Sequence, residues 1–124
     1  MFLIVDDEPD MCWALEHILK KNRFRVKKAL SGEKALALIR SNRFHLALLD
    51  AKLPDMEGLD LAVRIREADP SIRVIMVSGY FYGDDVPVQK ALEEGVICGF
   101  IAKPFIHEEI LKAIQNASLP ETPP

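Results

Sequence analysis

Cysteine, long apolar runs and an excess of positive charge are all scarce or missing in this 124-residue chain. The two cysteines, Cys12 and Cys98, stand far apart without CxxC spacing, so we expect two reduced thiols that pack as small apolar groups. No apolar run is long enough to span a bilayer. The formal net charge is −3, so the segment lacks the basic footprint of a nucleic-acid-binding domain.

Signals for secretion and for zinc binding are missing as well. The chain enters an apolar run directly after Met1, without a signal-peptide pattern, and its histidines lack metal-ligand spacing. We therefore expect a cytoplasmic protein with one domain over residues 1–117, large enough to fold without disulfide or structural metal. Residues 118–124 contain three prolines and are expected to form a tail or linker.

Five short apolar runs alternate with five amphipathic segments along the chain. The runs cover residues 2–5, 24–29, 44–49, 72–77 and 96–102, and most are typical of strands buried on both faces of a parallel sheet. The run 24–29 is weaker, and its Arg25, Lys27 and Lys28 suggest a strand at the edge of the sheet. Helical spacing predicts helices from Pro9 to about Asn22 and over residues 31–41, 59–68, 86–94 and 106–117. This alternation predicts an α/β fold with right-handed crossovers.

Residues suited to phosphoryl chemistry stand where four of these runs end. Asp6 and Asp7 follow the first run, Asp50 the third, Ser78 the fourth and Lys103 the fifth. The carboxyl ends of parallel strands meet at one edge of the sheet, where ligands bind. We therefore expect an acidic site with a lysine and a hydroxyl group.

The chemistry of such a site calls for a hard cation. Clustered carboxylates repel one another, and Mg²⁺ with its preference for oxygen ligands removes that cost. Asp6 and Asp7 point in opposite directions if the chain is extended, so one would reach the metal directly and the other through water. Asp50 is either a further ligand or a nucleophile that forms an aspartyl phosphate. Lys103 would offset phosphoryl charge, and Ser78 would hydrogen-bond to a phosphoryl oxygen.

Read together, these positions resemble the receiver domains of two-component response regulators. The resemblance covers about residues 1–117 and implies a flavodoxin-like (βα)5 three-layer sandwich with strand order 2-1-3-4-5. It rests on VDDE at 5–8, LDAKLPDMEG at 49–58, VSG at 77–79 and KPF at 103–105.

The resemblance also implies a role for each site residue. Asp50 would be the phosphoacceptor, and the peptide between Lys103 and Pro104 would be cis. Mg²⁺ would be held by Asp7 directly, by Asp6 partly through water, by Asp50 and by the backbone carbonyl of Lys52. The remaining roles are the switch hydroxyl for Ser78, the switch aromatic position for Phe100 and the phosphate-binding lysine for Lys103.

A receiver is a phosphorylation switch, not an enzyme with a diffusible substrate of the usual kind. The implied donor is a sensor histidine kinase or phosphotransfer protein, and the implied response is a change in the face formed by the fourth helix, fifth strand and fifth helix. That face could bind a partner, form a homodimer or release a C-terminal output domain. The stretch DDEPDMCWALEHIL resembles receivers of nitrogen-regulatory transcriptional activators. We expect no nucleic-acid or membrane contact by this segment itself.

Other functions fit the sequence less well. Haloacid-dehalogenase-like phosphatases, which also use an aspartyl phosphate, need a second aspartate where this chain has Lys52. A dinucleotide or flavin carrier is disfavoured because no GxGxxG follows the first run and the acids there would repel a pyrophosphate. A degenerate receiver that serves only as a docking module remains an alternative, which metal-dependent phosphoryl uptake would distinguish.

Two features depart from the family pattern. Lys103 follows Ser78 by 25 positions, a few more than usual, and we place the extra length in 79–87. Its Tyr80–Tyr82 cluster is a candidate interface. The last helix lacks an acidic N-cap, because Ile106 and His107 follow Phe105. Trp13 lies off the apolar face of the first helix and is expected to pack at the rim of the core; the alternative is an exposed side chain that marks a contact surface for a kinase or partner.

Overall fold

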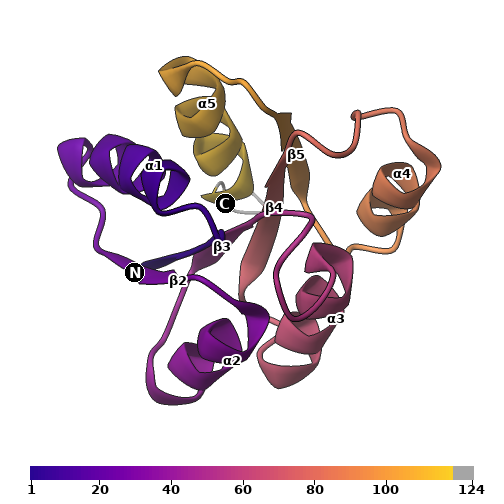
Figure 1. Cartoon of the computed structure of the whole chain (residues 1–124), viewed down its shortest axis with the longest axis horizontal. Coiled ribbons are helices and arrows are strands. Elements are labelled where there is room, and N and C mark those ends of the chain that lie inside the picture. The colour runs from indigo at the N-terminus through magenta and orange to yellow at the C-terminus, as the bar shows by residue number, and fades with distance from the viewer. Residues whose placement is uncertain (119–124) are drawn as a thin grey trace, which may run out of the picture.

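The computed structural model describes residues 1–118 as one parallel sheet with five helices (Figure 1). The strand order is β2-β1-β3-β4-β5, which confirms the predicted doubly wound topology. The strands are β1 (Phe2–Val5), β2 (Val26–Ala29), β3 (Leu46–Leu49), β4 (Arg73–Ser78) and β5 (Gly99–Ala102). The helices are α1 (Pro9–Lys21), α2 (Gly32–Ser41), α3 (Gly58–Ala68), α4 (Val86–Glu93) and α5 (His107–Ser118).

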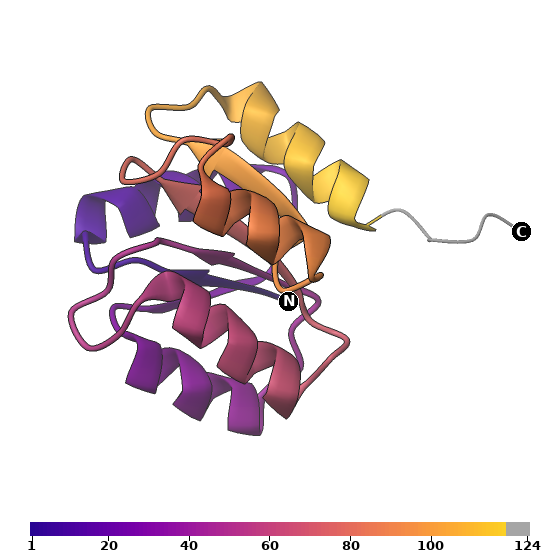
Figure 2. The ribbon, with the colours of Figure 1, turned by 90° about the vertical axis from the view of Figure 1, so that its right-hand side faces the viewer.

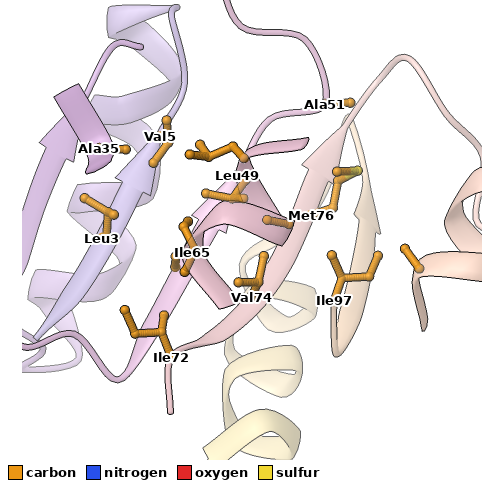
Figure 3. Close-up of a cluster of buried hydrophobic side chains, with 14 of the residues drawn as sticks. Leu3, Val5, Ala35, Leu49, Ala51, Ile65, Ile72, Val74, Met76 and Ile97 are labelled. Atoms are coloured by element: carbon orange, nitrogen blue, oxygen red, sulfur yellow. The ribbon is translucent and has the colours of Figure 1, made fainter. Parts of the chain in front are cut away.

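Helices cover both faces of the sheet and make three layers (Figure 2). Successive residues of a strand point to opposite faces. Leu3 and Val5 accordingly belong to the cluster that is completed by residues of α2, α3 and α4 (Figure 3), whereas Phe2 and Ile4 belong to the cluster with α1 and α5. Because both faces are buried, the central strands β1 and β3 are apolar throughout.

The predicted elements end close to where the structure ends them, but four strands begin later than predicted. The ladders of β2, β3, β4 and β5 are preceded by Phe24, Phe44, Ile72 and the stretch 96–98. Phe44 is buried all the same. Apolar burial before a strand and inside it therefore leaves the same pattern in the sequence.

Two side-chain predictions are wrong. Trp13 does not pack at the rim of the core, since 64% of its surface is exposed and its ring stacks on His17. Cys98 is exposed although it was expected to pack, whereas Cys12 is buried as expected. The prediction for residues 118–124 lies, apart from Ser118, outside the described residues. Among residues 1–118, no helix has the length and apolar character needed to cross a membrane.

Candidate functional site

The ladder places the predicted site residues at one edge of the sheet. The amide of Asp50 donates to the carbonyl of Val5 at 2.9 Å, and the amide of Lys103 donates to the carbonyl of Ser78 at 3.0 Å. The amide of Asp6 donates to the last residue of β2. These bonds extend the parallel register just beyond the strands, so the side chains that follow them converge as predicted.

Asp6, Asp7 and Asp50 form an acidic cluster. One carboxylate oxygen from each lies within 4.8 Å of the others. Their surroundings differ: Asp6 is buried, Asp50 is partly buried and Asp7 is exposed. Neighbouring residues at the end of β1 thus present their carboxylates in different environments. Asp6 also turns one oxygen towards the start of α1, where it accepts from the amide of Glu8 at 2.9 Å.

Lys103 supplies the positive charge of the cluster. Its Nζ donates to Asp6 Oδ2 at 2.9 Å and lies 3.7 Å from Asp50 Oδ1. Only 14% of the Lys103 side chain is exposed, and this burial by itself lowers the pKa of the ammonium group. The hydrogen bond to Asp6 and the charges of Asp6, Asp50 and Glu8 outweigh burial and raise the pKa of Lys103. The lysine is therefore a fixed cation at neutral pH.

The surroundings of Asp50 disfavour the charged form of its carboxyl group. Burial raises the pKa of its carboxyl, and the nearby charges of Asp6 and Asp7 raise it further. Lys103 and the amide of Ala51, which donates to Asp50 Oδ1 at 2.8 Å, act in the opposite direction without cancelling the shift. A further cation beside Asp50 would stabilise its charged form.

The donor set of this edge fits Mg²⁺. Three carboxylates lie together, and Lys103 is close to two of them, Asp6 and Asp50. Mg²⁺ binds through one or two carboxylates, waters and phosphate oxygens. The loop after β3 adds a backbone carbonyl oxygen, that of Lys52, which could bind the metal. Lys52 pairs with Glu57 in an antiparallel bridge, but the hydrogen bonds of that bridge use the carbonyl of Ala51 and the amide of Leu53. The bridge thus leaves the carbonyl of Lys52 unused.

Ser78 and Phe100, the two expected switch residues, lie in the neighbouring strands β4 and β5. Ser78 is fully buried at the end of β4, and its Oγ accepts from the amide of Tyr80 at 2.9 Å. Phe100 is partly buried against the core on the α4 side of the sheet. The cis peptide between Lys103 and Pro104 is confirmed.

The 79–87 segment is ordered by its own side chains. The amide of Tyr82 donates to Asp85 Oδ2 at 2.8 Å, and that of Asp85 donates back to the carbonyl of Tyr82. Tyr80 and Tyr82 are exposed, whereas Phe81 packs against the core. Lys52 Nζ sits 4.2 Å from the centre of the Tyr80 ring, a contact between two loops that no spacing in the sequence indicates.

The start of α5 has a substitute for the missing acidic N-cap. The helix begins at His107, one residue later than predicted. Glu109 turns back to accept from the amide of Ile106 at 3.1 Å. The acid that helps to satisfy this helix end therefore lies inside the helix and not before it.

Asp55, in the loop after β3, makes a contact that the sequence did not predict. Its two carboxylate oxygens accept from the amides of Gly32 and Glu33, each at 2.9 Å. These backbone bonds lower the pKa of the Asp55 carboxyl. The contact joins residues more than twenty positions apart, so local capping patterns could not reveal it. Ser31, by contrast, is a local N-cap of α2 and accepts from the amide of Lys34.

Comparison with known proteins assigns the family. The model of the response regulator receiver domain matches residues 2–115. Sporulation initiation phosphotransferase F of Bacillus subtilis (strain 168) is 34% identical over 92% of this chain and 90% of its own length. The crystal structure of a CheY-like receiver domain protein from Methanospirillum hungatei JF-1 matches with a TM-score of 0.85 and 31% identity, over 93% of this chain and 90% of that one.

Other relatives are longer than this chain. The C4-dicarboxylate transport transcriptional regulatory protein DctD of Rhizobium meliloti (strain 1021) is 30% identical over 92% of this chain, but the match spans only 24% of its own length. With the strand order, the strand-end residues and the family match in agreement, the chain belongs to the response regulator receiver domains.

Proposed function

We propose that Asp50 is the phosphoacceptor of a Mg²⁺-dependent receiver domain. The observation that carries this proposal is the partly buried Asp50 carboxylate, 3.7 Å from the Lys103 ammonium and clustered with Asp6 and Asp7. Asp50 directly follows the central strand β3, and burial raises the pKa of its carboxyl. A nearby cation, or conversion to an acyl phosphate, would relieve this cost of burying its charge.

In the proposed reaction an oxygen of the Asp50 carboxylate attacks the phosphorus of a phosphohistidine. The bond between phosphorus and the imidazole nitrogen breaks, and its electron pair stays with the imidazole. Lys103 stabilises the charge on the phosphoryl oxygens. Mg²⁺ would be held by Asp7, by Asp6 partly through water, by Asp50 and by the carbonyl of Lys52, and when bound it neutralises further phosphoryl charge.

The proposed response begins at Ser78. A phosphoryl oxygen on Asp50 would accept a hydrogen bond from the Ser78 hydroxyl and draw the Oγ towards Asp50, away from the amide of Tyr80 from which it now accepts. The loop before α4 then changes, Phe100 repacks, and the face formed by α4, β5 and α5 is altered. That face would act on a partner, a second copy or an output domain, including a transcriptional one, in the cytoplasm. The donor would be a sensor histidine kinase or a phosphotransfer protein.

Intact mass spectrometry tests this proposal. The wild type and Asp50→Asn are incubated with acetyl phosphate, with and without Mg²⁺. We expect one phosphoryl adduct in the wild type, only with Mg²⁺, and none in the variant. An adduct that persists in Asp50→Asn would contradict the assignment. Absence of any adduct in a chain that binds Mg²⁺ would favour the docking-module alternative, and steady release of phosphate from simple esters would favour a phosphatase.

A further inference from the structure

The loop between β3 and α3 is fastened to a different part of the chain by Asp55. Its carboxylate spans two consecutive amides at the start of α2, those of Gly32 and Glu33. Both oxygens are engaged, and the partners are backbone groups, which cannot turn away as a side chain could. The α2 helix in turn packs on the sheet through the fully buried Ala35. Asp55 therefore ties the loop to a fixed part of the fold.

A second contact locks the same two segments together. The Met56 side chain occupies the space that a Cβ on Gly32 would fill. Met56 also packs against the core on this side of the sheet. The neighbouring pairs Asp55–Met56 and Gly32–Glu33 thus fit each other by a polar contact and by shape.

Backbone hydrogen bonds close the loop between β3 and α3 on itself, so we infer that its two sides move together. The amide of Leu53 donates to the carbonyl of Met56 at 3.2 Å, and the amide of Gly58 donates to the carbonyl of Ala51 at 2.7 Å. Lys52 lies between these bonds, in the bridge with Glu57. The position of Asp55 consequently fixes the backbone of Lys52, two residues after Asp50.

We propose that Asp55 is a positioning residue of the metal site, which acts through the backbone of Lys52. This inference rests on the proposed function, in which the Lys52 carbonyl is a Mg²⁺ ligand. Asp55 itself touches neither the acidic cluster nor Lys103. Its contribution is to hold the Lys52 carbonyl in place before the metal binds. Residues that orient the ligands without touching the metal are common in metal sites.

The chain offers a matched control on the same helix end. Ser31 Oγ accepts from the amide of Lys34 at 3.2 Å, so Ser31→Ala also removes a cap of α2 but leaves the loop untouched. Mg²⁺ affinity is measured by calorimetric titration for the wild type, Asp55→Ala, Asp55→Asn and Ser31→Ala. We expect about tenfold weaker binding in Asp55→Ala, a smaller loss in Asp55→Asn, and wild-type affinity in Ser31→Ala.

Hydrogen exchange in the metal-free proteins supplies an independent readout. The amide of Gly58, which closes the loop, should exchange faster in both Asp55 variants than in Ser31→Ala. Wild-type Mg²⁺ affinity in both Asp55 variants would overturn the inference, and so would an equal loss in Ser31→Ala, which would trace the effect to α2 alone. A wild type that binds no Mg²⁺ would overturn the proposed function as well, so the two failures are distinguishable.

Discussion

Lys103 is the residue on which the electrostatics of the site depend. Its ammonium lies within 4 Å of Asp6, Glu8 and Asp50, and the side chain of Asp6 is almost fully buried. A buried carboxylate without a partner is costly. The same lysine therefore stabilises the fold by pairing with Asp6, and we propose that it also binds the phosphoryl group.

Lys103→Met should lower the stability of the metal-free protein. The change removes a charged hydrogen bond, worth about 1.5–3 kcal/mol, and leaves Asp6 buried beside two other acids. Urea unfolding measures the loss, and Mg²⁺ should restore part of it because the ion replaces the missing charge. Lys52→Met is the control, since Lys52 and Glu57 are both largely exposed and such pairs contribute little. Equal effects of the two changes would contradict this account.

Asp50→Asn should stabilise the metal-free protein at neutral pH. A carboxyl whose pKa is raised by folding disfavours the folded state above its ordinary pKa of about 3.9. The cost is fully present above the raised folded pKa and disappears as the pH falls below the ordinary one. The stability difference between variant and wild type should therefore shrink from pH 7 towards pH 4, in urea unfolding at each pH. A gain that is absent, or independent of pH, would show that Asp50 is not strained by its surroundings.

One rule, that the carboxyl ends of parallel strands meet at one edge of the sheet, was enough to predict that the five site residues lie together. They are Asp6, Asp7, Asp50, Ser78 and Lys103. The contacts that shape the site could not be predicted. Asp55 reaches α2, and Lys52 lies over Tyr80, through pairs of loops whose relative path depends on the folded sheet. No periodicity or local capping signal describes such contacts.

Among the elements, the loop after β3 has the strictest packing requirement. Gly58 begins α3, and a Cβ there would overlap the backbone carbonyl of Asp50. Gly32 begins α2 in the same way, but the atoms nearest to a Cβ there belong to the flexible side chain of Met56. The main-chain atoms of Asp50, the proposed phosphoacceptor, cannot yield without moving the acidic cluster, whereas the Met56 thioether can move.

Gly58→Ala should therefore cost more than Gly32→Ala. We expect a loss of about 1–3 kcal/mol in the free energy of unfolding for Gly58→Ala, the usual range for overpacking, together with weaker Mg²⁺ binding. Gly32→Ala should cost less, and Mg²⁺ binding should be less affected. Thermal unfolding and metal titration of both variants test this order. Reversal of the order would show that the loop, and not Met56, is the softer partner.

The ends of the strands can be predicted more accurately than their beginnings, for a physical reason. Strand ends coincide with a change from apolar to polar residues, as at Val5 and Leu49. The beginnings of β2, β3 and β5 follow residues such as Phe24 and Phe44, which pack against the sheet without joining the ladder. Burial alone cannot separate these cases, so the start of a strand was set too early.

In the whole molecule, the sheet gathers the acids, the lysine and the loops before α3 and α4 at one edge. The loops are linked there by Lys52 and Tyr80, while Ser78 is linked to Tyr80 through its amide. A change at Asp50 can therefore reach α4 through contacts already present. This arrangement is the basis for the proposed switch, which shifts a pre-existing equilibrium of the fold.

The central claim is that a phosphoryl group on Asp50 reorganises the β4–α4 loop through Ser78. The most direct test is the amide spectrum of ¹⁵N-labelled protein with Mg²⁺, before and after acetyl phosphate, in the wild type and Asp50→Asn. We predict large shifts of the Tyr80 amide and of residues in α4 and β5 in the wild type, and none in the variant. A wild type that carries the phosphoryl group while its Tyr80 amide and α4 signals stay unchanged would contradict the account.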